Sequence, residues 1–229
     1  MIKQQFKYYP LFKRLFDLIL ALTLIILILP IMILVAVLIF IKSKEFPIFI
    51  QERGITLNNF RYKIIKFKTI KERKSVGLED RLNNNIFYKP ELTSELTKFS
   101  NWLRTTGIDE LPQLLNVVIG NMSLIGPRPL MLSDLEIMKR EYPGFYKKRG
   151  TFNSIPGISG LWQIYGERRK GMENLIKLEE DYKRNASLLF DLKLMIKTIP
   201  IIIFANHSDS ISSNREIINT QQIKITDLN

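Results

Sequence analysis

The segment 18-LILALTLIILILPIMILVAVLIFI-41 is the most informative part of the sequence for the fold, because it contains no charged residue from Leu18 to Ile41. At about 1.5 Å per residue, a straight helix of this length is long enough to cross the hydrocarbon core of a bilayer. Secretory signal peptides have shorter apolar cores and a small-residue cleavage site, which the following FIKSKEF (40–46) lacks. We therefore expect the segment to remain on the protein and to lie in a membrane.

Pro30 lies near the middle of this segment and predicts a kink, because proline removes an amide donor and clashes with the preceding turn. Basic residues flank the segment on both sides: Lys3, Lys7, Lys13 and Arg14 before it, and Lys42, Lys44, Arg53 and Arg61 after it. A spanning helix normally shows an excess of basic residues on one side only. Two basic ends favour a re-entrant helix that bends at Pro30 and returns to the same face. A kinked single span is the alternative that the sequence leaves open.

The composition is that of a folded protein with an anionic partner. The chain has 229 residues, of which 46% are hydrophobic and 24% charged. Its net charge of +12 favours nucleic acid, a membrane surface or a phosphorylated substrate. The absence of cysteine excludes disulfides and thiolate metal sites. The single histidine, His207, lies in a polar stretch, which argues against histidine-based catalysis and zinc binding.

We divide the chain into a membrane-anchoring segment (1–45), a folded domain (46–206) and a polar tail (207–229). The fold class expected for the domain is α+β and mostly helical. We expect a short β-hairpin in 46–70, a polar loop in 71–90, helices in 91–104, 130–142, 174–184 and 187–204, and a glycine-rich shaped loop in 154–169. The last helix is amphipathic, which fits either a membrane-surface helix or ordinary core packing.

The stretch 107-GIDELPQLLNVVIGNMSLIGPRP-129 contains two adjacent carboxylates, Asp109 and Glu110, in an otherwise basic chain. Asp109 is at the position of a helix N-cap, and Pro112 falls in the first turn, where its missing amide is not needed. The free amides of a helix N-terminus favour an ionised Asp109 and can hold a phosphate. A purely structural cap is the simpler interpretation of this stretch taken alone.

Cations near the two acids favour a catalytic interpretation. Arg104 precedes them, and Arg128 follows between Pro127 and Pro129, which restrain the backbone and suit bidentate capture of a phosphate. Lys66, in the motif KFKT, adds positive charge. Adjacent acids, several cations and a membrane segment together indicate Mg²⁺-assisted chemistry on a phosphate beside a lipid.

Several motifs occur here in one order: QERG, KFKT, RTTGIDELPQLLNVVIGNMSLIGPRPL, PGISGLWQIYG and DYKRNASLLFDLKLMIKTI. In these motifs the chain resembles the bacterial sugar transferases, the monotopic polyprenol-phosphate phosphoglycosyl transferases. The resemblance extends from about Lys13 to Thr198 and is closest to the short members with one membrane segment. The chain departs from the common pattern at Lys68, where arginine is usual, and at Gly107-Ile108, where Ser-Leu is usual.

The resemblance implies transfer of a phosphosugar from a UDP-sugar to a polyprenol (undecaprenyl) phosphate, with release of UMP, as the first step of a membrane-associated glycan assembly. It also implies a monotopic protein of the bacterial cytoplasmic (inner) membrane, with a re-entrant helix hairpin in the lipid, amphipathic interfacial helices and a catalytic domain over 46–206 that faces the cytoplasm.

The resemblance further implies roles for individual residues. Asp109 is expected to be the nucleophile that forms an aspartyl-phosphosugar, and Glu110 to bind Mg²⁺ with Asp109 or to manage the proton of the incoming lipid phosphate. The expected substrate-binding residues are Arg128, Arg104, Lys66, Pro127 and Pro129.

Two other functions have to be weighed against this one. A catalytically silent, membrane-anchored adaptor of a glycan-assembly complex would not need Asp109 and Glu110, and both are present. A membrane-tethered nucleic-acid binder would need clustered basic residues with exposed stacking aromatics, whereas the basic residues here are dispersed, so we expect no nucleic-acid partner. The sequence leaves open the sugar, the pathway and the oligomeric state, a homodimer included.

Overall fold

The computed structural model describes residues 11–69, 97–167 and 170–203. The expected loop at 71–90 and the expected tail at 207–229 lie outside the described residues. Within them the protein is mostly helical, with one long apolar N-terminal helix and small sheets, which confirms the α+β class.

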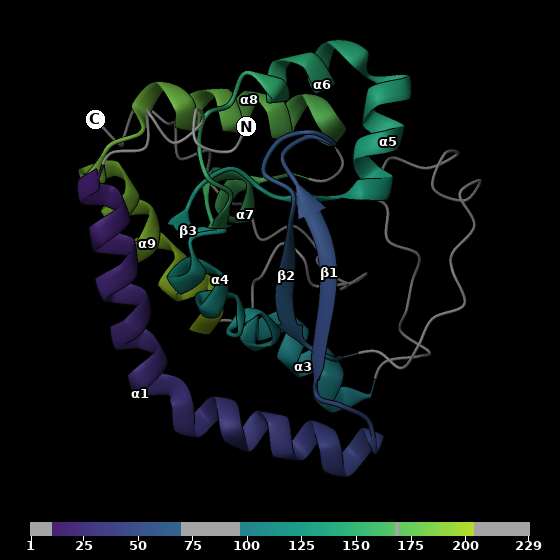
Figure 1. Cartoon of the computed structure of the whole chain (residues 1–229), viewed down its shortest axis with the longest axis vertical. Helices are drawn as coiled ribbons and strands as arrows, with labels where there is room; N and C mark the ends of the chain where they lie inside the picture. The colour runs from purple at the N-terminus through teal and green to yellow at the C-terminus, as the bar shows by residue number, and fades with distance from the viewer. Residues whose placement is uncertain (1–10, 70–96, 168–169, 204–229) are drawn as a thin grey trace.

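Helix α1 (Leu11–Ser43) contains the apolar segment and Pro30. Figure 1 shows α1 as two limbs that meet at a sharp bend, which agrees with the kink expected at proline. By length and composition α1 is apolar enough to cross a membrane. Much of its surface consists of exposed aliphatic side chains, such as Ile26 (72% exposed) and Leu27 (68%).

A hairpin of β1 (Ile48–Gly54) and β2 (Tyr62–Phe67) follows α1, as the sequence predicts. The two strands are antiparallel, with Phe49 opposite Lys66, and the short β4 (Leu130–Met131) pairs with the far edge of β1. Strand β2 is therefore an edge strand in the order β2-β1-β4. A second sheet pairs β3 (Ser123–Ile125) with β5 (Gly157–Ser159) in parallel.

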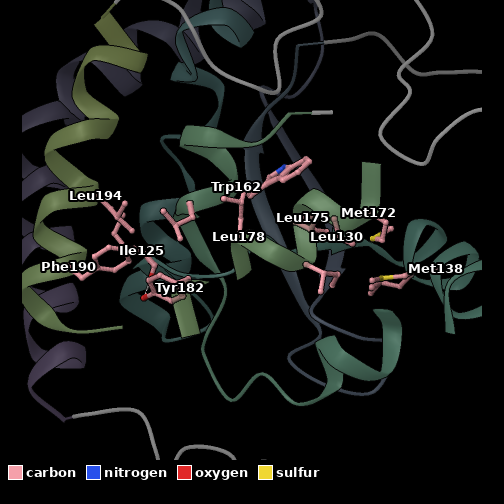
Figure 2. Packing of buried hydrophobic residues seen from close by; sticks show 13 residues of the cluster. Ile125, Leu130, Met138, Trp162, Met172, Leu175, Leu178, Tyr182, Phe190 and Leu194 are labelled. Carbon is pink, nitrogen blue, oxygen red and sulfur yellow. Dashed lines mark hydrogen bonds between the residues drawn. The ribbon is translucent and has the colours of Figure 1, made fainter. Parts of the chain in front are cut away.

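Helices lie at both ends of the β1-β2 hairpin and on the side of β2 (Figure 1). In chain order they are α3 (Lys98–Thr106), the 3₁₀ helix η2 (Ile108–Glu110), α4 (Gln113–Ile119), α5 (Leu132–Glu141), α6 (Pro143–Gly150), α7 (Leu161–Tyr165), α8 (Gly171–Asn185) and α9 (Leu188–Ile203). The main hydrophobic core lies between α5, α7, α8 and α9, around Trp162, Leu175 and Leu194 (Figure 2).

Two smaller clusters attach α1 to the domain, one on each limb. Ala21, in the first limb, packs with Leu114 and Val117 of α4. Val35 and Ile39, in the second limb, pack with residues of β2 and α3. The domain therefore contacts α1 on both sides of Pro30.

Two features of the chain between 142 and 169 differ from expectation. The helix expected over 130–142 does end before Pro143, but a further helix that was not expected, α6, begins at Pro143, where the missing amide hydrogen is not needed. The segment 154–169 was expected to be an irregular loop, but it contains β5 and α7. Its glycines allow close backbone contact rather than irregularity, because a Cβ on Gly157 would overlap the backbone of Gly126.

Candidate active site

A small hollow of about 240 Å³, counting the part open to solvent, lies where β1, β2, η2, α4, α7 and the Gly-Pro-Arg-Pro turn meet. Its polar lining residues are Arg53, Lys66, Glu110, Gln113, Arg128 and Gln163. Three cations and one carboxylate therefore share this hollow. This charge pattern suits an anionic ligand.

Glu110 owes its place in the hollow to a tight turn. Helix α3 ends at Gly107, whose φ of 73° lies in the left-handed region that favours glycine. The Glu110 amide then donates to the Gly107 carbonyl (2.9 Å), which closes η2. From this turn the Glu110 carboxylate forms an ion pair with Lys66 Nζ of β2, and both side chains are largely buried (11% and 17% exposed).

Asp109 lies in η2 and is half-buried. The expectation that it caps the following helix was wrong, because α4 begins at Gln113 and its N-cap is Pro112, which has no side-chain cap bond. A 3₁₀ turn separates the acidic pair from α4. The turn places Glu110 in the hollow, with Asp109 immediately before it.

Asn116 fastens α4 to the free edge of β2. Its Nδ2 donates to the Lys63 carbonyl (2.8 Å), and its Oδ1 accepts from the Ile65 amide (3.0 Å). An edge strand has unpaired backbone groups, and this side chain pairs with two of them as a neighbouring strand would. The contact holds the strand that carries Lys66 against the helix that follows Glu110.

The turn that carries Arg128 is fixed by the 155–160 segment. The Gly157 amide donates to the Pro127 carbonyl (3.0 Å), and the Gly126 amide donates to the Ser159 carbonyl (2.9 Å). A Cβ on Gly126 would overlap the Ile155 carbonyl oxygen, so the two backbones approach closely because glycine is present. This packing explains the spacing of the two glycine- and proline-rich motifs.

A fully buried ion pair lies behind the same turn. Arg149 of α6 and Glu179 of α8 are 3.0 Å apart and 0% and 2% exposed in their side chains. Burial raises the pKa of Glu179 to about 7, against the opposing effect of Arg149. Both residues bond to the backbone of Arg128.

Tyr62 lies behind the hollow on β2 and is buried. Burial raises the pKa of its hydroxyl far above the ordinary value, an effect that Arg53 opposes and Glu110 reinforces. Tyr62 therefore stays protonated at any physiological pH and is no base for the site.

The structure brings together four of the seven predicted site residues, since Lys66, Glu110, Arg128 and Pro129 line the hollow. The other three do not line it: Asp109 precedes Glu110 in η2, Pro127 is buried in the turn, and Arg104 is half-buried in the last turn of α3.

The sequence interpretation missed Arg53, Gln113 and Gln163 as lining residues. Arg53 was counted only as a basic flank of the membrane segment, although its motif QERG was a signal. The two glutamines carry no charge or spacing pattern that would single them out, and only the fold brings them to the hollow.

A magnesium ion held by Asp109 and Glu110 would take most of its ligands from water and substrate. Within the described ranges, no group of three or more His, Cys, Asp or Glu side chains is placed to hold a metal. Mg²⁺ is commonly held by one or two carboxylates, with water and substrate phosphate as its other ligands. Asp109 and Glu110 supply two adjacent carboxylates of this kind.

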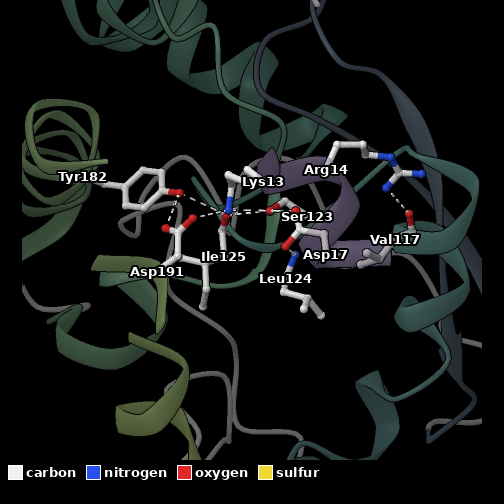
Figure 3. Close-up of polar contacts among 9 residues, drawn as sticks. All are labelled: Lys13, Arg14, Asp17, Val117, Ser123, Leu124, Ile125, Tyr182 and Asp191. Carbon is white, nitrogen blue, oxygen red and sulfur yellow. Dashed lines mark hydrogen bonds and ion pairs between the residues drawn. The ribbon is translucent and has the colours of Figure 1, made fainter. Parts of the chain in front are cut away.

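Charged residues at the start of α1 are tied to the domain rather than exposed to solvent (Figure 3). Lys13 forms an ion pair with Asp191 of α9, and Arg14 donates to the Val117 carbonyl (2.6 Å). Asp17 is buried and accepts from Ser123 Oγ (2.7 Å). These contacts satisfy three charges at the edge of an apolar helix.

The other end of α1 is attached to the same domain. Lys42 Nζ lies 4.2 Å from the centre of the Phe99 ring in α3, and Glu45 forms a 2.8 Å ion pair with Lys68. Both polar ends of the apolar helix therefore contact one domain.

Comparison with known proteins shows the family to which the chain that carries this site belongs. A model of the family described as bacterial sugar transferase matches residues 8–205. The exopolysaccharide production protein ExoY of Rhizobium meliloti (strain 1021) is 33% identical, over 70% of this chain and 72% of its own. A UDP-galactose-lipid carrier transferase of Erwinia amylovora is 32% identical, over 83% of this chain and 40% of its own.

A third relative is the UDP-glucose:undecaprenyl-phosphate glucose-1-phosphate transferase of Escherichia coli (strain K12). It is 30% identical, over 82% of this chain and 39% of its own length. The chain thus spans about two fifths of the two longer relatives and most of ExoY.

Proposed function

Because this chain belongs to the bacterial sugar transferase family, we propose that it transfers a phosphosugar from a UDP-sugar to a polyprenol phosphate. Two relatives are named for such activities, one on UDP-galactose with a lipid carrier and one on UDP-glucose with undecaprenyl phosphate, and they support this reaction. The observation that carries the proposal is the hollow in which Arg53, Lys66 and Arg128 surround Glu110. Three cations beside an acidic pair suit a pyrophosphate substrate better than a neutral one.

In the proposed mechanism the Asp109 carboxylate attacks the β-phosphorus of the UDP-sugar. A bond forms between Asp109 and phosphorus, the bond to the bridging oxygen breaks, and UMP leaves with that oxygen. The polyprenol phosphate then attacks the aspartyl-phosphosugar, which yields the lipid diphosphosugar and restores Asp109. Covalent catalysis of this kind divides one difficult displacement into two easier steps.

The cations of the hollow would act on the charge that develops during both steps. Arg128 would bind the nucleotide's phosphates in bidentate fashion, and Lys66 would shift between Glu110 and a phosphate oxygen. Mg²⁺ held by Asp109 and Glu110 would supply further charge neutralisation on the pyrophosphate. Arg104 would reach a phosphate only from outside the hollow, so we give it the weakest role.

We further propose that α1 enters the membrane and returns to the same face, so that residues 1–45 anchor a catalytic domain formed by residues 46–206. The support is that Lys13 and Arg14 at one end, and Lys42 at the other, contact the same domain. A helix that crossed the bilayer would separate its two ends by about 30 Å of hydrocarbon. The catalytic domain would then face the cytoplasm, where UDP-sugars are made.

Release of UMP tests the reaction. Purified protein in detergent is given Mg²⁺, undecaprenyl phosphate and a panel of UDP-sugars, beside Asp109→Asn and the control Asp181→Asn. The control loses only an ion pair with Arg184 at the surface of α8. We expect UMP release that depends on one sugar, needs intact Asp109 and survives in the control. If no sugar gives UMP, the transferase proposal fails and a silent membrane-anchored adaptor becomes the better interpretation.

Cysteine labelling tests the topology independently, because the chain has no cysteine of its own. Lys3→Cys and Lys44→Cys are each treated in whole cells with a membrane-impermeant thiol reagent, and again after permeabilisation. Re-entry predicts that both are shielded in whole cells and labelled after permeabilisation. Labelling of only one position in whole cells would show that α1 spans.

A further inference from the structure

The backbone of Arg128 is held on both sides by two buried side chains of opposite charge. Its amide donates to Glu179 Oε1 (3.1 Å), and its carbonyl accepts from Arg149 Nη2. The same Nη2 also donates to Glu179 Oε1 (3.0 Å). Arg149 comes from α6 and Glu179 from α8, so two different helices meet at one residue of the turn.

These contacts leave the backbone of Arg128 little freedom. Arg128 lies between Pro127 and Pro129. The ring of each proline fixes its own φ near −65°, so the backbone is restrained on both sides of Arg128. The amide and the carbonyl of Arg128 belong to the two peptide planes on either side of its Cα. Because both planes are anchored to buried groups, the direction in which the Arg128 side chain leaves the backbone is fixed. That side chain lines the hollow with Lys66 and Glu110.

The buried pair is poorly explained as a stabilising element. Arg149 Nε and Nη1 and Glu179 Oε2 are buried and have no hydrogen-bond partner among the described residues. Desolvation of a buried ion pair often exceeds its Coulombic gain, and replacing such a pair by apolar side chains is commonly neutral or stabilising. Three unsatisfied polar atoms add a further desolvation cost, so this pair is expected to contribute little to stability.

We propose that Arg149 and Glu179 are positioning residues that aim Arg128 at the phosphates of the substrate. The inference rests on the proposed function for the identity of that anion, but not for the geometry of the turn. Neither residue touches the hollow, so each acts only through the backbone of Arg128.

Three variants test this role. Glu179→Gln keeps an oxygen that can accept from the Arg128 amide, so it serves as the matched control. Glu179→Leu removes that acceptor, and the double variant Arg149→Met/Glu179→Leu removes both anchors without leaving an unpaired charge. The readouts are hydrogen exchange at the Arg128 amide, kcat and KM for the UDP-sugar, and the thermal midpoint. Because Pro127 and Pro129 have no amide hydrogen, Arg128 supplies the only exchanging amide of the Pro-Arg-Pro turn.

In the double variant we expect the Arg128 amide to exchange roughly 10- to 100-fold faster, as for loss of a hydrogen bond to a charged group. KM should rise by a similar factor, with a smaller change in kcat, while the thermal midpoint stays equal or increases. Glu179→Gln should remain close to wild type in exchange and KM. This separation of binding from stability is not expected of residues that merely hold the core together.

Unchanged exchange and KM in the double variant would overturn the inference. So would a rise in KM that occurs only together with faster exchange throughout β1 and β2, because that pattern indicates general loss of structure. If the wild-type protein shows no transfer with any UDP-sugar, the proposed function fails instead, and hydrogen exchange alone still decides whether the pair fixes the turn.

Discussion

Asn116→Ala should destabilise the protein, because Asn116 joins α4 to the edge of β2. The substitution removes both side-chain bonds between α4 and the edge of β2, at a residue only 1% exposed. It leaves the Lys63 carbonyl and the Ile65 amide without these partners. An unsatisfied buried backbone group costs about 1–3 kcal/mol; because Lys63 is exposed and Ile65 half-buried, water relieves part of this cost. We expect a loss of about 2–4 kcal/mol.

Thermal unfolding in detergent, followed by tryptophan fluorescence, measures the effect, since Trp162 is 2% exposed and reports on the core. For a protein of this size the expected loss corresponds to a decrease in the midpoint of roughly 5–15 °C. Transfer activity should fall as well, because Asn116 joins the strand of Lys66 to the helix that follows Glu110.

Asn101→Ala is the matched control, because Asn101 is an exposed residue of α3 and its loss should change stability by no more than about 0.5 kcal/mol. If Asn116→Ala unfolds at the same temperature as Asn101→Ala, the two hydrogen bonds do not hold β2, and our description of how the site is assembled is wrong.

Three further predictions concern the charges of the site. Lys66→Met should lower kcat/KM by about 10²–10³-fold in the UMP assay, because it removes a cation from the hollow and leaves Glu110 without its ion-pair partner; activity within threefold of wild type would contradict this. Burial raises the pKa of Glu179 from 4.5 to about 7, so the folded state binds a proton more tightly than the unfolded chain. The resulting stability is fully present below pH 4.5 and is lost as the pH rises through 7. Thermal midpoints measured from pH 5 to 8 should therefore decrease in wild type and decrease less in Glu179→Gln. Equal slopes of midpoint against pH in the two proteins would refute the assignment. Removal of Mg²⁺ with EDTA should abolish UMP release without changing the thermal midpoint, since two adjacent carboxylates form no structural metal site; a large fall in the midpoint would indicate that the metal supports the fold.

The elements that follow from local patterns could be predicted from the sequence. The hairpin was readable from its turn residues, and α8 and α9 from their apolar periodicity. The helix that begins at Pro143 was missed because proline is compatible with both a helix stop and a first helical residue. Asp109 was assigned as a cap because the 3₁₀ turn between it and α4 has the same acidic and proline signals as a helix start.

The charged residues of the candidate site could be predicted from the sequence, but the residues that hold them in place could not. Lys66, Glu110 and Arg128 stand out because they are charged residues within distinctive motifs. Arg149 and Glu179 look like ordinary helical surface residues, and only the packing of α6 and α8 shows that both are buried behind the turn. Asn116 was hidden for the same reason, because its partners are backbone atoms about fifty residues earlier in the chain.

The most direct test of the central claim is to trap the phosphosugar on Asp109. The protein is incubated with Mg²⁺ and the UDP-sugar that supports UMP release, without a lipid acceptor, then quenched in acid and analysed by mass spectrometry of the intact chain and its peptides. We predict one added phosphosugar on the peptide that contains Asp109, its loss on addition of undecaprenyl phosphate, and no adduct in Asp109→Asn. A wild-type protein that releases UMP only when the lipid is present, and never carries the adduct, would contradict the covalent mechanism.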